Sequence, residues 1–219
     1  MVGASGGGFP VDIVLFGMIA VFLILRLRSV LGRRTGFERA AVAPDRSAAS
    51  GPVIEGHAEP VPARAVPDPS SRLGVELARI HTVDRSFEPA RFLAGAEAAF
   101  RMIVGAFAKG DRATLHPLLG EDIFGNFDQA ITAREAAGET QRSEIRAISS
   151  ASVEDAQLRG SVASVTVRFV SEQVTQTLSR EGAAVFGTEA PVELIDIWTF
   201  ERDLTHSSPN WRLVAAHSG

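Results

Sequence analysis

Residues 89–110 read PARFLAGAEAAFRMIVGAFAKG, and this stretch decides the fold class of the C-terminal part of the chain. Four large apolar residues and one alanine recur at the spacing of a helix that buries one face: Phe92, Ala96, Phe100, Ile103 and Phe107. Pro89 in the first turn and Gly110 after the last apolar residue mark the two ends. The stretch therefore predicts a long helix at the centre of a core.

Shorter helices are predicted on both sides of this stretch. Residues 72–83 carry leucine and isoleucine on one helical face, which either packs on the domain or lies on a membrane surface. The few charges on the opposite face favour packing. Asp111 is a capping residue for a short helix, and a further helix is predicted over residues 121–137, with Gly138 as its stop.

After Gly138 the period of the apolar residues changes from 3.6 to 2. Residues 163–169 alternate apolar and polar side chains, which is typical of a half-buried strand that continues to about residue 179. Other strands are predicted at residues 143–158, 184–186, 192–202 and 211–217. Helices followed by a run of strands predict an α+β fold, with about three helices packed on a curved antiparallel sheet.

The N-terminal part of the chain contains an apolar run at residues 9–25, FPVDIVLFGMIAVFLIL. At about 1.5 Å per residue it spans roughly 25 Å, slightly less than the ~30 Å hydrocarbon core of a bilayer. We therefore expect a transmembrane anchor within residues 1–34. Its membrane-facing residues are Val11, Ile13, Val14, Leu15, Phe16, Met18, Ile19, Val21, Phe22, Leu23, Ile24 and Leu25.

Four arginines follow the run directly, and no lysine or arginine precedes it: Arg26, Arg28, Arg33 and Arg34. A cleaved signal peptide has the opposite arrangement, with positive charge first and small residues at a cleavage site afterwards. A buried core helix is the other alternative, but no domain surrounds the run. The arginines predict a single-pass anchor with the N-terminus outside and the C-terminal domain in the cytoplasm.

Residues 35–71 contain six of the 11 prolines and no apolar periodicity. They are predicted to form a disordered linker, with a reach on the order of 30–35 Å, between the anchor and a domain at residues 72–219. Residues 84–219 carry 13 basic and 19 acidic residues, a net charge of −6. An acidic domain repels phosphate backbones, so nucleic acid is not an expected partner.

Five segments, in this order, resemble the C-terminal domain of the Tim44-like family, named after a subunit of the mitochondrial translocase of the inner membrane. They are FLAGAEAAFRMIVGAFAKGD (92–111), FGNFDQAITAREAAGE (124–139), VTVRFVSEQ (165–173), WTFERD (198–203) and PNWRLVAAH (209–217). The basic flank of the apolar run is similar to that of bacterial, membrane-anchored members.

The resemblance implies a cone-shaped fold related to nuclear transport factor 2. It also implies an adaptor function, because the mitochondrial member recruits the matrix Hsp70 to the presequence translocase. The expected protein is therefore an adaptor of the bacterial inner membrane that presents a protein-binding domain to the cytoplasm. Its expected partners are an Hsp70-type chaperone or an inner-membrane complex, and a lipid is a further candidate ligand.

Related cone folds also include isomerases and dehydratases, which place a carboxylate in the cone, often beside a tyrosine. Asp196 shares strand parity with Trp198, but the chain has no tyrosine, and its histidines are scattered. No phosphate-loop or metalloprotease motif occurs. We expect a hydrogen-bonded structural role for Asp196, a protein that is not an enzyme, and no cofactor or metal. The alternative is a lipid or apolar ligand in a cone pocket formed by Phe127, Asp196, Trp198 and Phe200.

Overall fold

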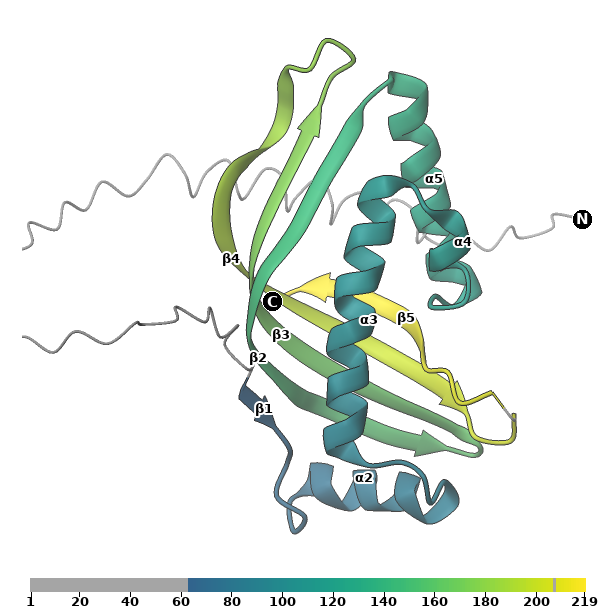
Figure 1. Cartoon of the computed structure of the whole chain (residues 1–219). Coiled ribbons are helices and arrows are strands. Elements are labelled where there is room, and N and C mark those ends of the chain that lie inside the picture. Colours follow the sequence, from purple (N-terminus) through teal and green to yellow (C-terminus); the bar gives the residue numbers. More distant parts are fainter. Residues whose placement is uncertain (1–62, 207) are drawn as a thin grey trace, which may run out of the picture. The chain divides into compact units, whose positions relative to one another are not determined.

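The computed structural model describes residues 63–206 and 208–219 (Figure 1). The predicted anchor at residues 1–34, its four arginines and most of the predicted linker lie outside these residues. Among the described helices, none combines the length and the apolar character that crossing a membrane requires.

Four helices come first along the domain, after one short strand. They are α2 (Arg72–Val83), α3 (Pro89–Lys109), α4 (Arg112–Leu115) and α5 (Glu121–Ala137). The predicted ends of α3 are confirmed: Pro89 occupies the first turn, and Gly110 closes the helix in the left-handed conformation at φ 70°. Asp111 caps α4 by accepting a hydrogen bond from the Thr114 amide.

Four long or medium strands form the antiparallel part of the sheet. They are β2 (Thr140–Arg159), β3 (Val162–Leu178), β4 (Ala184–Asp203) and β5 (Arg212–Ser218), hydrogen-bonded in chain order. A fifth strand, β1 (Ala63–Ala65), pairs in parallel with β2, so the sheet is mixed and not purely antiparallel as expected. Residues 63–71, which fall in the predicted linker, are therefore part of the folded domain.

The two strands predicted at residues 184–186 and 192–202 are one strand, β4. Its pairing with β3 is irregular near Gly187, where the backbone has φ 82°. A Cβ atom at this position would lie 2.0 Å from the carbonyl oxygen of Thr175, so only glycine fits without a backbone shift. Gly187 itself pairs with Gln176 and lies between two irregularities of this continuous strand, one at Val185 and one at residues 189–191.

Helix α3 lies across the concave face of the curved sheet, as Figure 1 shows. Its Phe100 ring stacks on Phe169 of β3 at a centroid distance of 4.5 Å and meets Trp198 of β4 edge-on at 4.6 Å. All three side chains are buried. The predicted curved sheet with a covering helix is confirmed, and side chains fill this part of the cone.

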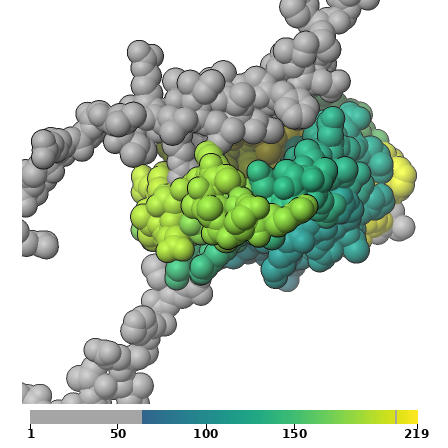
Figure 2. Space-filling model, turned by 90° about the horizontal axis from the view of Figure 1, so that it is seen from above, coloured from purple at the N-terminus to yellow at the C-terminus, as the bar shows by residue number. Residues whose placement is uncertain are grey.

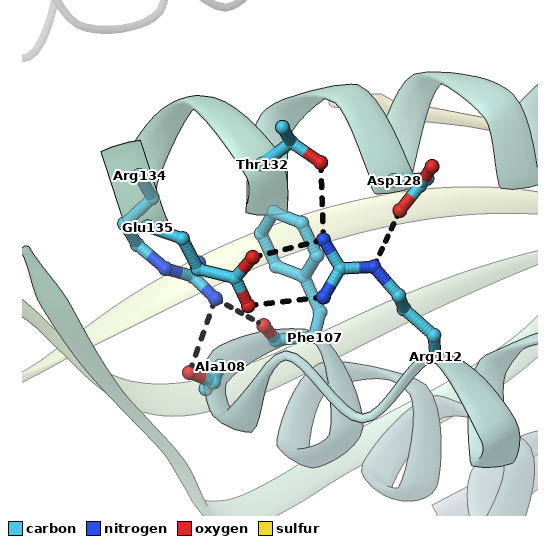
Figure 3. Close-up of polar contacts among 7 residues, drawn as sticks. All are labelled: Phe107, Ala108, Arg112, Asp128, Thr132, Arg134 and Glu135. Atoms are coloured by element: carbon cyan, nitrogen blue, oxygen red, sulfur yellow. Dashed lines mark hydrogen bonds and ion pairs between the residues drawn. The ribbon is translucent and has the colours of Figure 1, made fainter. Parts of the chain in front are cut away.

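Two arginines join α5 to its neighbours, Arg112 from α4 and Arg134 to the C-terminal end of α3 (Figure 3). Arg112 forms a forked ion pair with Glu135 at 2.9 and 3.0 Å and also binds Asp128. Arg134 donates to the backbone carbonyl of Phe107 at 2.7 Å and lies over the ring of that residue. The Arg134 contacts satisfy carbonyl groups at the C-terminus of α3, and both sets of contacts help to position α5.

The β3–β4 turn projects from the sheet beside the helices. Figure 2 looks onto this end of the domain and shows the lime surface of the hairpin next to the teal surface of the helical part. Val185 at the start of β4 is 52% exposed, whereas the residues of β3 that lie under α3 are fully buried. The hairpin end is therefore a peripheral part of the fold, away from the aromatic core.

Candidate binding pocket

A pocket of about 550 Å³ opens between the α2–α3 connection, the N-terminal half of α3, the segment after α4 and the β4–β5 connection. Its apolar lining includes four aromatic residues, Phe87, Phe92, Phe200 and Trp211, of which only Trp211 is more than 8% exposed. Its volume falls within the range of roughly 300–1,000 Å³ that is typical of concave, mostly apolar binding sites. The pocket lies beside the filled core and is the candidate functional site.

Local structure explains why the aromatic residues meet here. Phe92 lies in the first turns of α3 on its inward face, and Trp211 immediately precedes β5. Their ring centroids are 4.8 Å apart, and Phe87 contacts Trp211 at 5.7 Å. The backbone carbonyl of Phe87 accepts a hydrogen bond from Nδ1 of His81 at 2.8 Å, which holds the α2–α3 connection in place.

One nearly buried ion pair forms part of the pocket wall. Nη1 of Arg202 lies 2.8 Å from Oδ2 of Asp84, and the two side chains are only 14% and 13% exposed. The hydroxyl of Ser86 lowers the pKa of Asp84 most, and burial opposes it; the Ser86 amide and Arg202 lower the pKa further. The carboxylate is thus ionised and compensated at neutral pH.

The structure does not bring the four predicted pocket residues together. Phe200 is 1% exposed and lines the pocket. Trp198 packs against Phe100 in the core, while Phe127 packs against Phe107 at 4.8 Å, where α5 meets α3.

The physical reason lies in the length of the strand. Asp196, Trp198 and Phe200 share one face of β4, but they are spread over roughly 13 Å at about 3.3 Å per residue. Helix α3 covers the middle of that distance, so the three side chains meet different surroundings. Sequence reasoning missed Phe87, Phe92 and Trp211 as pocket residues. No local signal in the sequence indicated them, because the three residues come from segments that meet only in the tertiary structure.

Asp196 is half-buried and lies in a small polar cluster on the inner face of the sheet. Its Oδ2 accepts a hydrogen bond from Nε2 of Gln173 at 2.7 Å, and the same amide donates to Ser171 at 2.9 Å. Burial raises the pKa of Asp196, and the hydrogen bond from Gln173 acts in the opposite direction. Among residues 63–206 and 208–219, no group of three or more His, Asp or Glu side chains is placed to hold a metal.

An Asp196→Asn variant tests how ionisation of this carboxyl affects the stability of the domain. Because the folded-state pKa is raised, ionisation of Asp196 disfavours the folded state increasingly as the pH rises through that pKa. We expect the variant to be as stable as the wild type or more stable at pH 7, and the difference to vanish below about pH 4. Urea unfolding at both pH values measures this, and a clear destabilisation at pH 7 would contradict it.

Among solved structures, one match is the intermembrane space region of the chloroplast protein ARC6, with 12% sequence identity and a TM-score of 0.42 over 59% of this chain and 95% of that chain. No curated protein matches the sequence. The model of the Tim44-like domain matches residues 73–218, from the start of α2 to the end of β5. The chain therefore belongs to the Tim44-like domain family.

Proposed function

We propose that this protein is a membrane-tethered adaptor whose Tim44-like domain binds an apolar segment of a partner protein in the pocket between α3 and the β4–β5 connection. The observation that carries the proposal is the pocket itself, which has a volume of about 550 Å³ and four aromatic residues in its lining. The core under α3 is filled by Phe100, Phe169 and Trp198, so the aromatic pocket is the better binding site.

The chemistry of the pocket favours a protein segment. Phe87, Phe92 and Phe200 are at most 8% exposed and form the apolar base of the pocket, while the half-buried Trp211 can contact an apolar side chain of a partner. The charges in the wall are paired: Asp84 with Arg202, and Glu88 with Arg91 at 3.5 Å on the exposed rim. Because these charges are paired with each other, the pocket wall offers no net charge to attract a charged ligand.

The net charge of the domain argues against a lipid surface as the ligand. Residues 84–219 carry a charge of −6, and anionic lipid headgroups repel an acidic surface. The membrane location comes instead from the apolar run at residues 9–25 and the four arginines after it. We place the domain on the cytoplasmic side of a bacterial inner membrane. An Hsp70-type chaperone or an inner-membrane complex is the first partner to test, given the family resemblance.

A Gly95→Leu variant fills the pocket without removing a core contact. Gly95 lines the pocket on α3, and a Cβ atom there meets nothing within 4 Å. Leucine also favours the helix by about 0.5–1 kcal/mol relative to glycine. We expect a folded variant that captures its partner at least tenfold less than the wild type. Crosslinked pull-down of the full chain from intact membranes measures this loss.

Gly105→Leu is the matched control, because Gly105 lies on the same helix, has the same free space and is not part of the pocket. It should leave partner capture unchanged. Equal capture by the Gly95→Leu variant and the wild type would contradict the proposal. Loss of copurifying lipid with unchanged protein partners would show that the pocket holds an acyl chain.

A chain without residues 9–25 should no longer sediment with membranes.

A further inference from the structure

Helix α3 carries a buried carboxylate outside the aromatic pocket. Glu97 is 6% exposed, and its helical neighbours Phe100 and Leu93 belong to the core. A carboxylate that is removed from water strongly disfavours the folded state unless hydrogen bonds compensate it. A residue from outside the helix must therefore satisfy Glu97.

Arg64 of β1 compensates this carboxylate with a fork of two hydrogen bonds. Its Nε donates to Oε1 of Glu97 at 2.8 Å, and its Nη2 donates to Oε2 at 3.0 Å. Only a guanidinium group offers two parallel donors in this geometry, and lysine would leave one oxygen without its partner. The pair is therefore selective for arginine.

The strand that delivers Arg64 is held by few other contacts. Ala63, Arg64 and Ala65 pair in parallel with Ser150, Ala151 and Ser152 of β2, and the pairing stops after these three residues. Ala65 is exposed, and Val66 is 46% exposed. Apart from its backbone pairing, β1 is thus fixed to the described part of the chain mainly by the arginine fork.

The next segment of the chain, by contrast, is packed tightly on α2. A Cβ atom at Gly74 would lie 2.1 Å from the backbone oxygen of Asp68, so the chain at Asp68 and Pro69 lies directly on the helix. The Ser71 side chain caps α2 and also donates to the Asp68 carbonyl at 2.6 Å. Residues 68–71 are thus anchored on α2 by contacts that do not involve the β1–β2 pairing.

We propose that the β2 edge at residues 150–152 and Glu97 form a docking site for an extended peptide segment that carries arginine. The chain closes this site with its own β1, and release of β1 opens it to an arginine-bearing extended segment of another protein. A strand added to a free sheet edge is a common mode of peptide recognition. None of these residues lines the aromatic pocket, so the proposal is independent of the function proposed above.

Hydrogen exchange of the full chain in detergent tests the release of β1. In an Arg64→Ala variant, amides at residues 63–65 and those of residues 150–152 that face β1 should exchange roughly tenfold to a hundredfold faster, because two hydrogen bonds to a charged group are lost. The amides of α3 and β3 should keep their protection. Arg72→Ala is the control, since Arg72 is 79% exposed and forms only a 3.4 Å ion pair with Asp155. Unchanged exchange at residues 63–65 in the Arg64→Ala variant would overturn the proposal.

A peptide probe tests the docking of a second segment. The probe has the sequence of residues 60–67, PVPARAVP, and is added in excess to the full-length Arg64→Ala variant. We expect it to restore protection at residues 150–152, while versions with lysine or alanine in place of its arginine bind at least tenfold more weakly. With Glu97→Gln added to the variant, the arginine and lysine probes should bind equally. No binding, or equal binding of the arginine and alanine probes to the Arg64→Ala variant, would overturn the proposal.

Discussion

A Phe100→Ala variant is expected to lose about 3–5 kcal/mol of unfolding free energy, the range typical of large-to-small changes at fully buried aromatic residues. Phe100 is 0% exposed and lies between α3 and the sheet, in contact with Phe169 and Trp198. Its removal leaves a cavity bordered by two rigid rings, which the surrounding side chains fill only in part. The stacked ring pair at 4.5 Å is lost as well.

Urea unfolding followed by circular dichroism measures this effect. Met102→Ala is the matched control, because Met102 lies two residues further along the same helix and is 49% exposed. The control should change the stability by less than about 1 kcal/mol. Similar losses in the two variants would mean that the aromatic contact under α3 does not hold the domain together.

The second large effect is expected for Arg202→Met, which leaves the carboxylate of Asp84 nearly buried and without its cation. Loss of one partner of a buried pair destabilises by roughly 3–5 kcal/mol, and we expect about 2–3 here because Ser86 still binds the carboxylate. Arg202 also donates to the backbone oxygen of Ser208 at 3.2 Å. The β4–β5 connection, which carries Trp211, should therefore loosen in the variant.

The pH dependence gives this prediction a definite sign. The folded-state pKa of Asp84 is lowered, so its stabilising contribution is present above the unfolded-state pKa of about 4 and is lost as the pH falls through the folded value. The difference between the wild type and Arg202→Met should thus be large at pH 7 and shrink at pH 3. Urea unfolding at both pH values checks this.

An Asp84→Asn, Arg202→Met double variant separates the buried charge from the lost packing. It removes the uncompensated carboxylate, so it should recover part of the stability that the single Arg202→Met variant loses. If the double variant is no more stable than the single variant at pH 7, the buried charge is not the cause of the loss.

The fold could be predicted from the sequence wherever the periodicity is long and regular. The 21 residues of α3 carry both a continuous apolar stripe and clear end signals, and β3 alternates apolar and polar side chains over residues 163–169. The strand β1 could not be predicted, because three residues show no periodicity and the contact of Arg64 with Glu97 joins residues 33 positions apart. The break predicted between residues 186 and 192 is irregular pairing within one continuous strand, which the sequence alone does not distinguish from a turn.

The pocket was less predictable than the fold. Strand parity correctly placed Trp198 and Phe200 on the same face of β4, but it does not say which of them the helix covers. Phe87, Phe92 and Trp211 come from three segments that meet only when the α2–α3 and β4–β5 connections fold against each other. Such a meeting depends on tertiary structure, and the local pattern of each segment contains no trace of it.

The placement of the two tryptophans has an optical consequence. The chain contains two tryptophans and no tyrosine. Trp198 is 5% exposed inside the core, and Trp211 lines the pocket. Trp198 sits in dry, aromatic surroundings, whereas the emission of Trp211 depends on what fills the space beside it. The fluorescence of Trp198 thus reports on the folding of the core, and that of Trp211 reports on the occupancy of the pocket. A Trp211→Phe variant isolates the emission of Trp198, and a Trp198→Phe variant isolates that of Trp211.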